Sequence, residues 1–65
     1  MAQKLTSKDL TELSELLESE SLAYKKCVSY AVMAADPVLK EKLGSYANNH
    51  RTRFEKLLSY LNSAQ

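Results

Sequence analysis

The sequence contains very little of what small proteins use to hold themselves together. It is 65 residues long and has one cysteine, Cys27, and one histidine, His50. A disulfide within the chain is therefore excluded, as is a zinc site with four Cys and His ligands from one copy. A chain this short buries only about 60% of the surface that its unfolded form exposes, so it usually needs such a staple. Association with another chain is the means of stabilisation that remains.

The low content of other residue types excludes several classes of protein. Tryptophan is absent, and glycine and proline occur once each, which is typical of a helical chain. A single glycine cannot form the glycine-rich loops that bind phosphate or dinucleotides. A net charge of +1 argues against a nucleic-acid binder. There is no long apolar run or targeting pattern, so we expect a cytoplasmic protein that does not bind membranes.

One break divides the chain, at Asp36-Pro37. Aspartate is a favoured N-cap and proline is favoured at the first position of a helix, so a second helix should begin there. At the other end, Thr6 followed by Asp9 resembles a capping box for the first helix. We predict one domain over residues 1–65, with helices at about 7–35 and 37–62.

Apolar residues recur at spacings of three and four in both predicted helices and define a seam. The seam comprises Leu10, Leu13, Leu17, Glu20, Tyr24, Cys27, Ala31 and Ala34, then Leu43, Ala47, His50, Phe54, Leu57 and Leu61. It is flanked by Leu16, Ala23, Tyr30, Tyr46 and Leu58. Such a wide stripe suits four packed helices better than two. We predict an all-α antiparallel hairpin that dimerises into a four-helix bundle.

Charges and aromatic residues add two expectations. In an antiparallel hairpin, residues whose numbers sum to roughly 71 should lie level, since each helix rises ~1.5 Å per residue. Glu18 would then lie level with Arg53, and Glu15 with Lys56. Tyr46, Arg53 and Tyr60 share one track of the second helix, and such a strip is either a contact surface for another protein or packs along the bundle edge.

Two polar residues interrupt the seam, and they are the candidate site. Glu20 and His50 should lie level with each other, where leucines would be expected. A carboxylate buried without a partner is costly, so it should gain one, become neutral or bind a cation. The structural interpretation is a hydrogen bond that fixes the register of the helices. The functional interpretation is a metal site for Zn or Fe. Tyr24, one turn from Glu20, either joins this polar layer or belongs to the core.

No catalytic residues are predicted. Cys27 and His50 should lie ~9 Å apart along the helix axis, which is too far for a nucleophile and its base. Cys27 is better explained as a small apolar filler of the seam. Gly44 either lets another helix approach closely or is neutral.

Several segments resemble the small spore coat F-like proteins of the ferritin-like superfamily. These segments are Leu5–Leu10 (LTSKDL), Glu18–Lys26 (ESESLAYKK), Asp36–Lys40 (DPVLK) and Ala47–His50 (ANNH), followed by Leu57, Leu58 and Leu61. The resemblance implies a ferritin-like bundle and a role in a spore coat or a similar assembly.

In that superfamily the metal ligands are a Glu on one helix and a Glu-x-x-His on the next, duplicated across the bundle. Glu20 and His50 match the first acid and the histidine, but Ala47 stands where the second acid would be. The resemblance therefore implies a structural, non-enzymatic homodimer without a cofactor. The alternatives are a metal-binding protein that uses Glu20 and His50 of both copies, and a helical adaptor without metal.

Overall fold

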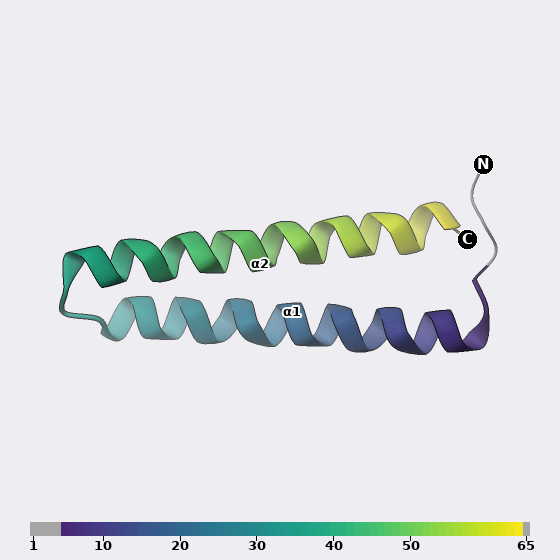
Figure 1. Ribbon diagram of the computed structural model, residues 1–65, viewed down its shortest axis with the longest axis horizontal. Coiled ribbons are helices and arrows are strands. Elements are labelled where there is room, and N and C mark those ends of the chain that lie inside the picture. The colour runs from purple at the N-terminus through teal and green to yellow at the C-terminus, as the bar shows by residue number, and fades with distance from the viewer. Residues whose placement is uncertain (1–4, 65) are drawn as a thin grey trace.

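Two antiparallel helices joined by a short turn make up the fold. The computed structural model describes residues 5–64, in which α1 spans Ser7–Met33 and α2 spans Pro37–Ala64. The two ends of the described chain lie together, at the end of the hairpin opposite the turn (Figure 1). The hairpin measures 47 × 20 × 10 Å, and residues 5–64 contain no strand. The predicted all-α hairpin is confirmed.

Both helices begin as the sequence predicts. The Thr6 hydroxyl accepts a hydrogen bond from the Asp9 backbone N–H at 3.0 Å, and the Asp9 carboxylate accepts one from the Thr6 N–H at 3.1 Å. This reciprocal pair is the predicted capping box. At the start of α2, the Asp36 carboxylate accepts a hydrogen bond from the Val38 N–H at 2.9 Å. Asp36 therefore caps α2, with Pro37 at its first position.

The far ends of the helices differ from the prediction by two residues each. The first helix ends at Met33 rather than near residue 35, because Ala34 already has an extended backbone. The residue before a proline is also disfavoured in the helical region, so Asp36 does not extend α1. The second helix continues to Ala64 instead of ending near residue 62. No glycine or proline follows Asn62 to stop it.

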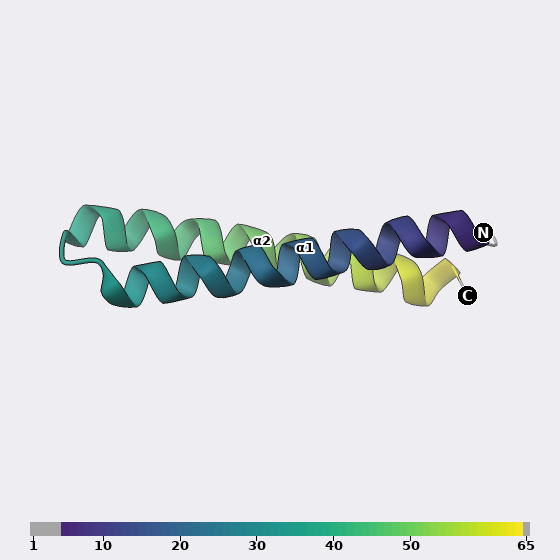
Figure 2. The same cartoon turned by 90° about the horizontal axis from the view of Figure 1, so that it is seen from below.

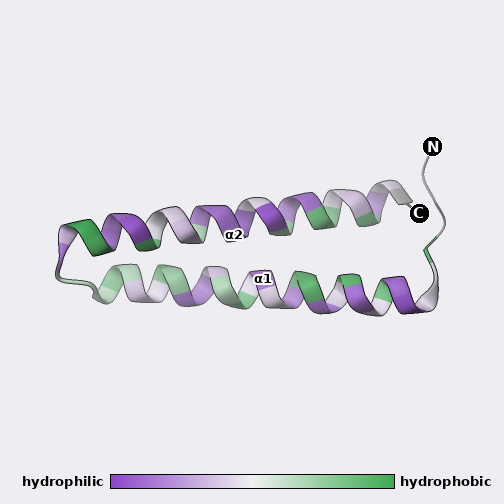
Figure 3. Ribbon diagram, in the orientation of Figure 1, coloured by the Kyte–Doolittle hydropathy of each residue, from purple (hydrophilic) through white to green (hydrophobic). Residues whose placement is uncertain are grey.

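The predicted seam forms the contact between the helices, but it leaves the core thin. Within residues 5–63, only Leu13 and Ala47 are buried, at 7% and 5% exposed. The other seam residues are half-buried, except Leu10, which is exposed. The helices cross at a shallow angle (Figure 2), and apolar segments occur on the sides that face each other (Figure 3). In the described chain, neither helix is long and apolar enough to span a membrane.

The charged residues that we expected to lie level form no ion pairs across the hairpin. Within the described chain, the ion pairs of lysine and arginine join neighbouring turns of one helix: Lys8 with Glu12 at 3.9 Å and Arg51 with Glu55 at 3.8 Å. Successive residues rotate by about 100° around a helix, so a shared level does not imply a shared face. By this rotation Glu18 and Arg53 lie on opposite broad faces of the hairpin.

Candidate functional site

The Glu20–His50 contact is the only side-chain hydrogen bond between the helices in the described chain. Nδ1 of His50 lies 2.6 Å from Oε2 of Glu20, a short hydrogen-bonding distance. The predicted contact between these residues is therefore confirmed. Glu20 is the middle residue of α1, and His50 lies at the middle of α2. The pair thus marks the midpoint of the hairpin.

The pair is partly shielded from water. The side chain of Glu20 is 18% exposed and that of His50 is 26% exposed. Across residues 5–64, no other side chain forms a hydrogen bond with either group, so the Tyr24 hydroxyl does not join the pair. With Nδ1 directed at the carboxylate, the second ring nitrogen of His50, Nε2, remains available for another partner.

One copy of the chain does not assemble a metal site from the residues described. No group of three or more His, Cys, Asp and Glu side chains comes together between residues 5 and 64. Glu20 and His50 offer two ligands at most, whereas structural zinc sites use four. Cys27 is a half-buried free thiol and forms no hydrogen bond with His50. What one copy can do chemically is hold a carboxylate and an imidazole in contact.

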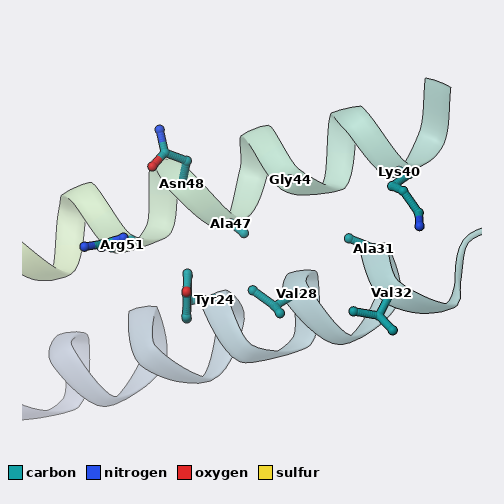
Figure 4. A pocket seen from close by; sticks show the side chains of 9 residues that line it. All are labelled: Tyr24, Val28, Ala31, Val32, Lys40, Gly44, Ala47, Asn48 and Arg51. Carbon is teal, nitrogen blue, oxygen red and sulfur yellow. The ribbon is translucent and has the colours of Figure 1, made fainter. Parts of the chain in front are cut away.

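An open groove runs along one broad face of the hairpin, which we call the groove face. Its larger part has a volume of about 390 Å³, and a second part of about 260 Å³ shares Tyr24 and Arg51 with it. The larger part is lined by Tyr24, Val28, Ala31, Val32, Lys40, Gly44, Ala47, Asn48 and Arg51 (Figure 4). We did not predict this groove; the signal for it was the small size of Ala31, Gly44 and Ala47.

Gly44 lies in this groove with open space around it. A Cβ atom added at Gly44 would meet no atom within 4 Å. The glycine therefore does not serve a close approach between the two helices of one copy.

The opposite broad face carries larger apolar side chains, and we call it the tyrosine face. By helical rotation it consists of Leu16, Ala23 and Tyr30 of α1 and Leu39, Tyr46, Arg53 and Tyr60 of α2. Its leucines and tyrosines are each between 48% and 55% exposed. The rotation also turns Glu20 and His50 toward this face. The predicted strip of Tyr46, Arg53 and Tyr60 is thus part of a wider apolar surface.

Comparison with known proteins adds no relative. No protein family, curated protein sequence or solved structure matches this chain. Ala47, which departs from the ferritin-like metal pattern, is the most buried residue for which burial is described.

Proposed function

We propose that this protein is a structural, non-enzymatic assembly component that acts as a homodimeric four-helix bundle. The spore coat-like resemblance of its sequence supports the assembly role. The observation that carries the proposal is the thin core of the hairpin, in which Leu13 and Ala47 are the only buried residues between positions 5 and 63. Large apolar side chains remain exposed along both helices. A second copy would remove those on one face from water.

The energetic argument is simple. Ordering one residue costs about 1–2 kcal/mol of backbone conformational entropy, which the burial of apolar surface must offset. A two-helix hairpin with two buried residues offsets little of this cost. When two hairpins pair, each helix packs against the second copy as well as against its own neighbour, so more apolar surface is buried by the same chain.

Sedimentation equilibrium and circular dichroism across a dilution series test this proposal. We expect a dimer of roughly 14–15 kDa, twice the mass of the 7.3 kDa chain. Its helicity should fall as it dissociates on dilution. A chain that stays fully helical as a monomer at all concentrations would contradict the proposal.

A second candidate is a metal-binding bundle, and the 2.6 Å contact between Glu20 and His50 favours a specific form of it. A carboxylate often holds a metal-bound histidine in place through the ring nitrogen that does not bind the metal. In this form Nε2 of His50 would bind Zn or Fe, and Glu20 would orient the ring. Each copy would then provide one direct ligand, so that a dimer would hold the metal through two histidines.

Metal analysis of protein purified without chelator separates the two candidates. The structural function predicts no bound metal and the same melting temperature with and without EDTA. About one Zn or Fe per dimer, lost in His50→Ala together with a melting temperature that EDTA lowers, would instead establish the metal-binding function.

A further inference from the structure

We propose that the second copy covers the tyrosine face, with the turns of the two hairpins at opposite ends, and that this brings the two Glu20–His50 pairs together at the centre of the dimer. The inference rests on the proposed homodimer and specifies its interface. Four observations carry it: the apolar content of this face, its size, the position of the pair, and the distribution of charge along the hairpin.

The first observation is the contrast between the two broad faces. The tyrosine face presents two leucines and three tyrosines, each about half exposed. Its charged residues are Arg53, the central Glu20, and Glu12 and Lys42 at its edges. The groove face is hollowed, and three cations line its two parts: Lys25, Lys40 and Arg51. Tyrosine and arginine are enriched in interfaces whereas lysine is depleted. A second copy on the groove face, with its turn at the opposite end, would bring the two Arg51 side chains together near the midpoint.

The second observation is area. A face of 47 × 20 Å covers roughly 900 Å² of one copy, close to the ~800 Å² per partner of a standard stable interface. The apolar side chains are spread along this length, from Tyr60 near the open end to Leu39 near the turn. A two-fold interface needs such a self-complementary surface, because the same patch must serve both copies.

The third observation is the midpoint position of Glu20 and His50. When two hairpins overlap over their full length with their turns at opposite ends, only the midpoint of each lies level with the midpoint of the other. The pair of one copy therefore meets the pair of the second copy. Because both residues are turned toward the tyrosine face, four polar groups would close into one layer within an otherwise apolar interface.

The charges favour opposite ends. The half of the hairpin near the turn carries Lys25, Lys26, Lys40 and Lys42, against Asp36 and Glu41. Between positions 5 and 64, the open half carries six carboxylates, five of them at the start of α1, against the four cations Lys8, Arg51, Arg53 and Lys56. Turns at the same end would bring eight lysines of two copies together, whereas opposite ends place them beside carboxylates.

Two leucines of α1 provide a matched test of the face. Leu16 and Leu22 are both 51% exposed, but only Leu16 lies on the tyrosine face. We expect Leu16→Glu to weaken dimerisation roughly 100-fold or more in sedimentation equilibrium, and Leu22→Glu to leave it within about threefold. Val28→Glu tests the groove face and should also be silent. If Val28→Glu dissociates the dimer and Leu16→Glu does not, the proposed face is wrong although the dimer stands.

A distance measurement tests the orientation, and NMR tests the meeting of the pairs. With spin labels at Val38→Cys in a Cys27→Ser background, opposite turns separate the two labels by roughly 35–40 Å along the axis; a distance below ~20 Å would overturn the orientation. In dimers of one labelled and one unlabelled copy, we expect contacts from the His50 ring to Ala23 or Tyr46 of the second copy. Intermolecular contacts confined to Val28 and Gly44 would overturn the proposal, and a monomer would remove the bundle itself.

Discussion

Glu20 and His50 join the midpoints of the two helices through a 2.6 Å contact between a carboxylate oxygen and an imidazole nitrogen. Every other side-chain hydrogen bond among residues 5–64 is local, to a backbone group two to four residues away. This pair is thus the one polar interaction that fixes how the helices slide along each other. A slip by one turn would break it and leave both groups facing apolar neighbours.

The pair should show a clear coupling energy. We expect Glu20→Met and His50→Leu each to leave one polar group without its partner, and the double variant to be more stable than the two single effects predict. The coupling should be at least ~1 kcal/mol, since hydrogen bonds to charged groups contribute about 1.5–3 kcal/mol. Urea unfolding at fixed protein concentration measures it. Additive effects within error would mean that the contact contributes nothing to stability.

Leu13 should be the leucine of α1 whose replacement by alanine destabilises the protein most. It is the most buried one, so Leu13→Ala should lower the free energy of unfolding by ~2–5 kcal/mol. We expect the half-buried seam residues Leu17 and Phe54 to follow it closely when changed to alanine. Leu22→Ala is the control, and at an exposed position it should change stability by less than ~0.5 kcal/mol. Equal losses at Leu13 and Leu22 would show that the seam is not the core.

Each cap should contribute on its own. Thr6→Ala and Asp36→Ala remove the side-chain acceptors that begin α1 and α2, and each should cost ~0.5–2 kcal/mol. Thr11→Ala is a suitable control, because the Thr11 hydroxyl bonds a carbonyl inside the first turns of α1 rather than capping it. Thermal melts compare the three. A loss for Thr11→Ala as large as for Thr6→Ala would argue against the capping box.

Gly44→Ala should stabilise the protein. Glycine within a helix costs ~1 kcal/mol relative to alanine, and the added methyl group would meet no atom. We expect a higher melting temperature and an unchanged dimer. A destabilised or dissociated Gly44→Ala variant would show that another helix packs closely against Gly44, and the interface would then be on the groove face.

Periodicity and capping chemistry were enough to predict the hairpin, its turn and the contact between Glu20 and His50. These features depend on spacing along the chain, which the sequence contains directly. The same spacing predicted that Glu18 lies level with Arg53. The two residues form no ion pair in the described chain, because rotation around the helix places them on different faces. The groove was not predicted, since it depends on how far the helix backbones stand apart at Ala31, Gly44 and Ala47. The partner of the tyrosine face is still a proposal, because its contacts involve a second chain.

The hairpin also has a mechanical polarity, because residues 5 and 64 lie at one end and the turn at the other (Figure 1). A force that pulls these two ends apart would separate the helices one turn at a time from the open end, and each step would break few contacts. A force that slides α1 along α2 would have to break all of the seam and the central pair together. An assembly built from this hairpin would therefore resist forces that shear one helix along the other and yield to forces that separate the two chain ends.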